Sequence, residues 1–178
     1  MATRILCLGN PLLADDAFGF RVAQELRRAW PQADIVESSA AGFDLLDLTL
    51  GASRLLVVDT FQTGAAPPGT VKVFRENDLQ PEPGTSPHYV GLFEALSLGK
   101  ELALPVPQEV AIIAVEPADC RTVGGAMHPA VRAAIPAVLE LIRTMEAGCP
   151  SGMQGDGGPI ERPSTNGGFG PEPALSKT

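Results

Sequence analysis

The sequence predicts an α/β fold, a three-layer α/β/α domain with a mainly parallel central sheet of about five strands. Two observations carry this prediction. Short, continuous apolar runs rich in Val, Ile and Leu recur along the chain, and such runs are typical of strands covered on both faces. Amphipathic helical patterns fill the gaps between these runs. Helices that alternate with buried strands indicate one sheet between two helical layers.

Five segments are expected to form the strands. The clearest are the apolar runs Leu55–Val58 and Val110–Val115, which contain no turn residue. The expected strands are Arg4–Leu8, Asp34–Glu37, Arg54–Asp59, Thr70–Phe74 and Glu109–Val115.

Four stretches carry helical spacing. Apolar residues recur every four positions from Phe18 to Trp30, and shorter patterns run over Phe43–Leu50 and Leu92–Leu102. The last pattern, from Pro129 to Met145, is the longest. Pro129 suits the first turn of a helix, where its missing N–H costs nothing, whereas Pro136 inside the pattern should kink or break it.

Length and composition indicate one domain over residues 1–147 and a tail over 148–178. The 178 residues suffice to bury a core without metals or disulfides. The tail is rich in Gly and Pro and has no periodic apolar pattern, so we expect it to be disordered. The ordinary hydrophobic content and the absence of a long apolar run predict a cytoplasmic protein without a membrane span. A monomer is expected.

The net charge of −8 argues against binding to nucleic acid or to an anionic membrane surface, because both need clustered Lys and Arg. Cys7, Cys120 and Cys149 are far apart and form no CxxC pair, which suits a reducing compartment. The chain contains no GxGxxG, GxxxxGK[ST] or GxSxG sequence, so dinucleotide, P-loop and serine-hydrolase functions lack their main support.

Polar residues that could carry chemistry stand where strands end or helices begin. Asp15 and Asp16 follow the first strand, Asp59 closes the third, and His88 precedes a helix. In a parallel sheet, ligands bind outside the carboxyl ends of the strands, so Asp16, Asp59 and His88 could converge on one cleft. Two carboxylates and an imidazole suit zinc, nickel or iron(II) and leave coordination positions open.

Each of these residues also has a structural alternative. Asp15 or Asp16 could cap the first helix, and Asp59 could accept hydrogen bonds from turn amides. A lone histidine such as His88 is often structural. His128, directly before Pro129, is better explained as the residue that starts a helix.

Glu116 directly follows the fifth strand. It either lines the same cleft or only terminates that strand.

Four segments in order resemble the hydrogenase maturation endopeptidases. They are GNPLLADDAFG after the first strand, LLVVDT in mid-chain, SPHYVGL before a helix, and AVEP followed by GGAMHPAV. The resemblance runs from Arg4 to Met145. It implies removal of a C-terminal peptide from the large-subunit precursor of a nickel-iron hydrogenase, after nickel has been installed.

The resemblance also implies a role for particular residues. The two carboxylates and the histidine that recognise nickel match Asp16, Asp59 and His88, and Asp16 departs from the Glu that is common at its position. The nickel is presented by the precursor rather than permanently bound. Either nickel activates the scissile carbonyl or water, or a carboxylate acts as general base, as in aspartic-type peptidases.

Two other functions stay open on the sequence. The same ligands would serve a non-catalytic nickel-recognising hydrogenase assembly factor that holds the precursor without cutting it. A small-molecule hydrolase or phosphorylase is disfavoured, because no basic cluster accompanies the acidic turn.

Overall fold

The computed structural model describes residues 2–75 and 87–147, and for residues 87–90 the backbone alone. It confirms the predicted α/β architecture. A five-stranded sheet has the order β2-β1-β3-β5-β4, in which β4 alone is antiparallel to its neighbour. The strands are β1 (Thr3–Leu8), β2 (Asp34–Ser38), β3 (Arg54–Thr60), β4 (Val71–Arg75) and β5 (Glu109–Val115).

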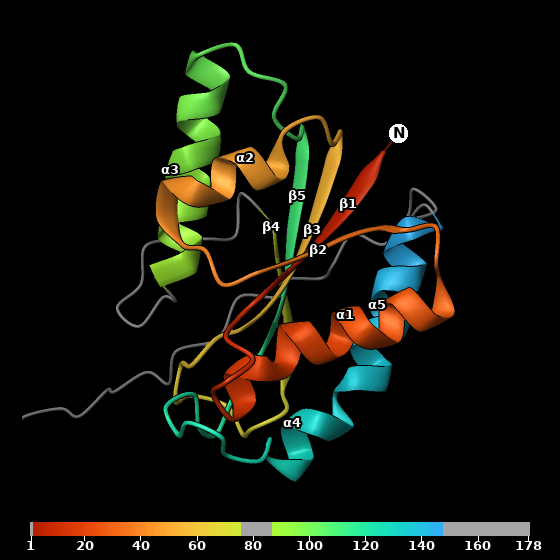
Figure 1. Cartoon of the computed structure of the whole chain (residues 1–178), viewed down its shortest axis with the longest axis vertical. Coiled ribbons are helices and arrows are strands. Elements are labelled where there is room, and N and C mark those ends of the chain that lie inside the picture. The colour runs from red at the N-terminus through yellow and green to blue at the C-terminus, as the bar shows by residue number, and fades with distance from the viewer. Residues whose placement is uncertain (1, 76–86, 148–178) are drawn as a thin grey trace, which may run out of the picture.

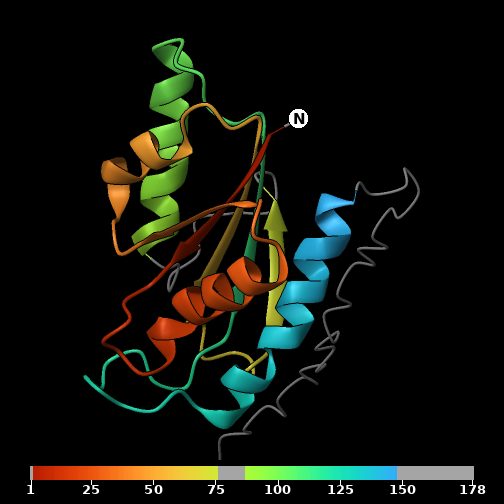
Figure 2. The same cartoon turned by 45° about the vertical axis from the view of Figure 1, so that its right-hand side comes forward.

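Helices cover both faces of the sheet. In Figures 1 and 2, α1, α4 and α5 lie on one side of it and α2 and α3 on the other. The helices are α1 (Phe18–Ala29), α2 (Leu45–Thr49), α3 (Pro87–Glu101), α4 (Pro129–Ala133) and α5 (Ile135–Glu146). Two short 3₁₀ turns precede α1 and α2, η1 (Asp15–Ala17) and η2 (Gly42–Asp44).

The alternation of side chains along each strand builds two separate cores. In β1, Ile5 and Cys7 pack in the cluster under α1 and α5, whereas Leu6 and Leu8 pack in the cluster under α2 and α3. All four side chains are buried. The continuous apolar runs of the sequence therefore arise because the inner strands are covered on both faces.

The predicted last helix is divided into α4 and α5. The division falls at Ala134, and Pro136 occupies the first turn of α5. This is the break that the position of Pro136 predicted, since a proline inside a helix removes a hydrogen bond and clashes with the preceding turn.

β4 is the edge strand where the sheet departs from the parallel arrangement. Its five residues are all half-buried or exposed, which fits a strand at the margin rather than in the centre of a sheet. The sequence predicted this strand one residue too early, at Thr70–Phe74.

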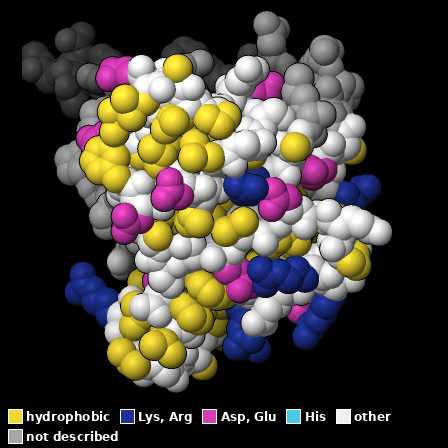
Figure 3. All heavy atoms as spheres, turned by 45° about the horizontal axis from the view of Figure 1, so that its top comes forward, with side chains coloured by type: hydrophobic (Ala, Val, Ile, Leu, Met, Phe, Trp, Pro, Cys, Tyr) yellow, Lys and Arg dark blue, Asp and Glu magenta, His cyan; other side chains and the backbone are white. Residues whose placement is uncertain are grey.

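Hydrophobic side chains also reach the surface. Figure 3 shows them gathered over α2 and α3, where Phe43, Leu98 and Leu102 are exposed.

Across residues 2–75 and 87–147, no helix is both long and apolar enough to cross a membrane. The proposed tail 148–178 lies outside the described residues, so its disorder stays a prediction.

A buried carboxylate ties the loop after β1 to the loop after β5. Asp15 is 0% exposed. Its Oδ2 accepts hydrogen bonds from the backbone N–H groups of Ala118 and Asp119, both at 2.8 Å, and its Oδ1 accepts one from His128 at 2.6 Å. Asp15 therefore has a structural role in joining two loops. It does not cap α1, whose first turn has no side-chain cap, so the capping alternative is wrong for Asp15.

Close backbone packing sets the position of α1 against β1. A methyl group at Gly19 would meet the carbonyl oxygen of Leu8 well inside van der Waals contact. Gly19 is buried in α1 and lets the helix lie directly on the strand.

We predict that Gly19→Ala lowers the free energy of unfolding by about 1–3 kcal/mol, the usual cost of overpacking. Helix propensity alone would predict the opposite, a gain of about 1 kcal/mol. Urea unfolding measures the change, and Gln24→Ala on the exposed side of α1 is the control. Equal stabilities of the two variants would contradict the proposed contact.

We predict that Asp15→Asn lowers the free energy of unfolding by about 2–3 kcal/mol, because the amide group must turn a donor toward one of the three backbone N–H groups. Asp47→Asn on the exposed surface of α2 is the matched control and should change stability by less than about 0.5 kcal/mol. Equal denaturation midpoints for both variants would show that Asp15 does not hold the two loops.

Candidate active site

The loops that follow β1, β3 and β5 meet at the carboxyl edge of the sheet. In Figures 1 and 2 the loops after β1 and β5 lie side by side at this edge. An isolated bridge pairs Leu13 with Val123 between them, and the backbone N–H of Ala14 donates to the carbonyl of Thr122. Ligands bind at such an edge in open α/β sheets.

The turn after β1 delivers Asp16 to this edge. The Asn10 side chain accepts a hydrogen bond from the N–H of Leu12, and the Asn10 N–H donates to the carbonyl oxygen of Asp16. Gly9 has φ of +138°, and a methyl group there would meet that same carbonyl oxygen. The glycine thus allows the backbone to fold back on itself and places Asp16 beside the strand end.

Asp59 lies at the penultimate position of β3 and is buried. The next residue, Thr60, connects it to Asp16. The Thr60 N–H donates to Asp59 Oδ1 at 2.7 Å, and the Thr60 hydroxyl lies 3.1 Å from Asp16 Oδ1. The structure thus brings two of the three predicted site residues, Asp16 and Asp59, around one threonine.

Cys120 completes this cluster from the loop after β5. Its Sγ lies 3.7 Å from the Thr60 hydroxyl. The pKa of the Cys120 thiol is raised to about 11, chiefly because burial disfavours the thiolate. The hydrogen bond that the thiol shares with Thr60 lowers this pKa, and the charges of Asp16, Asp15 and Asp59 contribute to raising it. The thiol is therefore protonated at neutral pH and acts as a weak hydrogen-bond donor.

Glu116 holds the loop after β3. It is buried, and it accepts hydrogen bonds from the N–H and the hydroxyl of Thr63 at 2.8 and 2.6 Å and from the N–H of Gly64 at 2.7 Å. Glu116 therefore does more than terminate β5. Its three contacts organise the neighbouring loop.

His88 falls in the first turn of α3, and its side chain lies outside the described residues. Its place in the site stays a prediction. Among the side chains that the structure describes, no three from His, Cys, Asp and Glu are grouped to hold a metal ion. Asp16 and Asp59 would thus need a further donor to form a metal site.

His128 starts α4, as predicted. Its Nδ1 accepts a hydrogen bond from the N–H of Ala130 at 3.3 Å, and Pro129 follows it in the first turn.

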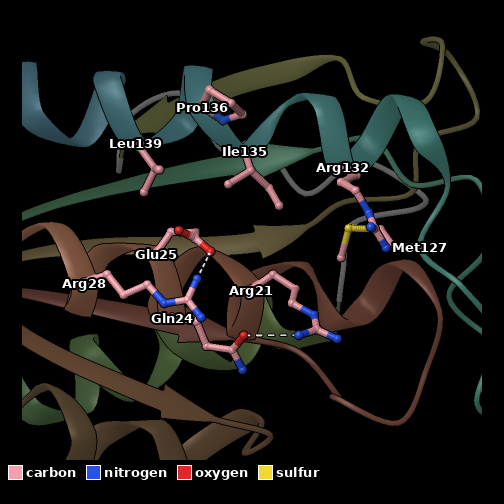
Figure 4. Close-up of a pocket in the computed structure, with 9 residues that line it drawn as sticks. All are labelled: Arg21, Gln24, Glu25, Arg28, Met127, Arg132, Ile135, Pro136 and Leu139. Carbon is pink, nitrogen blue, oxygen red and sulfur yellow. Dashed lines mark hydrogen bonds and ion pairs between the residues drawn. The ribbon is translucent and has the colours of Figure 1, made fainter.

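A separate groove of about 490 Å³ lies between α1 and the pair α4 and α5. Figure 4 shows Arg21 and Arg28 of α1 facing Ile135 and Leu139 of α5, with Arg28 paired to Glu25. None of Asp16, Asp59 or Thr60 lines it.

Sequence reasoning missed Thr60 and Cys120. Thr60 directly follows a candidate ligand, and the strand-end argument that selected Asp59 applies equally to its neighbour. Cys120 carries no local signal, since its contact with Thr60 spans 60 residues.

Comparison with known proteins shows which family the chain resembles. The family of HycI hydrogenase maturation proteases matches residues 20–145. The hydrogenase expression/formation protein HoxM of Cupriavidus necator is 31% identical over 139 residues, which are 75% of this chain and 68% of HoxM. The hydrogenase 2 maturation protease of Escherichia coli is 29% identical over 148 residues, 80% of this chain and 88% of that protein.

A solved structure agrees with these sequence matches. The hydrogenase maturating endopeptidase HybD of Escherichia coli superposes with a TM-score of 0.67 at 26% identity, over 83% of this chain and 94% of HybD. The family match covers well over half of the chain, and the fold agrees over nearly all of the relative. The chain therefore belongs to the hydrogenase maturation protease family, a family of peptidases.

Proposed function

We propose that this protein is an endopeptidase that removes a C-terminal peptide from the nickel-loaded large-subunit precursor of a nickel-iron hydrogenase. The observation that carries the proposal is the placement of Asp16 and Asp59 around Thr60 at the carboxyl edge of the sheet. Membership in the maturation protease family supports the reaction class and the kind of substrate.

In this proposal Asp16, Asp59 and His88 bind the nickel ion that the precursor brings. Carboxylate oxygens and an imidazole nitrogen are suitable ligands for such a borderline ion. The nickel is part of the substrate, so only a loaded precursor would complete the site. A peptidase of this kind would distinguish a nickel-loaded precursor from an empty one.

The reaction is hydrolysis of one peptide bond. A water oxygen adds to the scissile carbonyl carbon, the C–N bond breaks, and the new amine leaves with a proton. Nickel would polarise the carbonyl or lower the pKa of the water. Either aspartate would accept the water proton if it acts as general base, which is the aspartic-type alternative.

Two exposed apolar side chains beside the site fit a protein substrate. Leu12 is 67% exposed and Val123 is 75% exposed. They stand on the two loops joined by the Leu13–Val123 bridge and anchored by Asp15. We assign these two side chains to docking of the large-subunit precursor.

The first test is the mass of the nickel-loaded precursor after incubation with the protein. Wild type should release a discrete C-terminal fragment, whereas Asp16→Ala, Asp59→Ala and His88→Ala should lower kcat/KM by roughly 100-fold or more. Asp47→Asn is the control for loss of a carboxylate elsewhere. Precursor that is bound but keeps its full mass would instead identify a non-catalytic assembly factor.

The second test separates docking from chemistry. Leu12→Ser and Val123→Ser should raise KM for the loaded precursor about tenfold and leave kcat unchanged, because they remove contacts made equally in the ground and transition states. Leu102→Ser changes a leucine of similar exposure, 59%, just after α3 and is the matched control. An unchanged KM in the first two variants would exclude these loops from docking.

A further inference from the structure

We propose that Thr60 is a positioning residue for the candidate nickel ligands, and that Cys120 orients the Thr60 hydroxyl toward Asp16. This inference rests on the proposed function, since it assigns a role around the same two carboxylates. Neither residue is predicted to touch nickel or the scissile bond.

The argument begins with the contacts of one buried residue. Thr60 is buried, and it reaches both carboxylates through different atoms. Its backbone N–H donates to Asp59 Oδ1 at 2.7 Å, and its hydroxyl lies 3.1 Å from Asp16 Oδ1. Thr60 thus links the two carboxylates through two hydrogen bonds. Because threonine is β-branched, rotation about its χ1 is restricted, and its hydroxyl is held in place.

The direction of each hydrogen bond follows from the number of available protons. The Thr60 hydroxyl has a single proton, and this O–H donates to Asp16 Oδ1. The lone pairs of Oγ1 then remain for the Cys120 thiol at 3.7 Å. Burial keeps that thiol protonated, with a pKa of about 11. The result is a chain in which Cys120 S–H donates to Thr60 and Thr60 O–H donates to Asp16.

This chain fixes the Asp16 side chain before the substrate arrives. Asp16 is only partly buried, and without a partner its carboxylate would rotate about two bonds. Ordering it during folding removes that entropy cost from precursor binding and from the reaction. A hydrogen bond from a neutral hydroxyl also leaves the negative charge of the carboxylate in place, as binding of a cation requires.

Two variants of Thr60 separate the effect of its hydroxyl from the effect of its side-chain shape. Thr60→Val keeps the β-branched shape and removes the O–H, and Thr60→Ser keeps the O–H. We expect Thr60→Val to lower kcat/KM for trimming roughly tenfold or more, the loss expected for a hydrogen bond to a charged group. Thr60→Ser should stay within about threefold of wild type. Cys120→Ser should retain activity better than Cys120→Ala.

A spectroscopic readout does not depend on activity. The ¹³C resonance of the Asp16 carboxyl, assigned with Asp16→Asn, should shift in Thr60→Val and return toward the wild-type position in Thr60→Ser. Thermal unfolding of each variant checks that it is folded. If Thr60→Val fails to fold, the comparison of Cys120→Ala with Cys120→Ser tests the same chain.

The outcomes distinguish this inference from the proposed function. A wild-type protein that leaves the loaded precursor at its full mass would overturn the proposed function, and the carboxyl resonance would still decide whether Thr60 holds Asp16. Full trimming by Asp16→Ala and Asp59→Ala would overturn the roles proposed for the two carboxylates. Inactive aspartate variants together with a fully active Thr60→Val would overturn the positioning role alone. A Thr60→Ser variant as defective as Thr60→Val would also overturn it, because the hydroxyl would then be irrelevant.

Discussion

The arrangement of the site depends on the buried carboxylate of Asp15, which accepts hydrogen bonds from three backbone N–H groups. A carboxylate removed from water is costly unless it is well hydrogen-bonded, and Asp15 receives donors from Ala118, Asp119 and His128. This requirement forces the loop after β5 to close against the turn after β1. The positions of Asp16 and Cys120 follow from that closure.

The acidic residues near the carboxyl edge divide into two kinds. Asp15 and Glu116 are buried and accept three hydrogen bonds each from neighbouring loops. Asp16 and Asp59 meet around Thr60. Asp15 and Glu116 determine where the loops lie. Asp16 and Asp59 are the candidate site residues that these loops and β3 hold at the edge of the sheet. Adjacent residues with the same side chain, Asp15 and Asp16, thus have different tasks because η1 turns them in different directions.

Much of the fold follows from local patterns in the sequence. The runs Leu55–Val58 and Val110–Val115 are typical of central strands covered on both faces, and their side chains do pack in the two cores on either side of the sheet. Pro136 predicts the break before α5 because its effect on a helix is local. The antiparallel direction of β4 was not predictable, since a short strand pairs either way and the choice depends on the connection to β5.

The site was predictable only in part, for the same reason. Asp59 lies at the end of β3 and Asp16 follows β1, so the parallel arrangement of these strands predicts that both residues lie at the same edge of the sheet. The partners of Asp15 are more than 100 residues away, and no spacing rule reveals them. Thr60 and Cys120 are ordinary residues by type, and only three-dimensional contact gives them a role.

The span of the Asp15 contacts has a consequence during synthesis on the ribosome. His128 is 113 residues beyond Asp15, so a nascent chain that ends before α4 lacks one of the three donors to the Asp15 carboxylate. The strands β1 and β3 are complete long before that point, but the anchor of the turn that carries Asp16 is not. The contacts that hold the candidate site are thus complete only when nearly the whole domain has been synthesised.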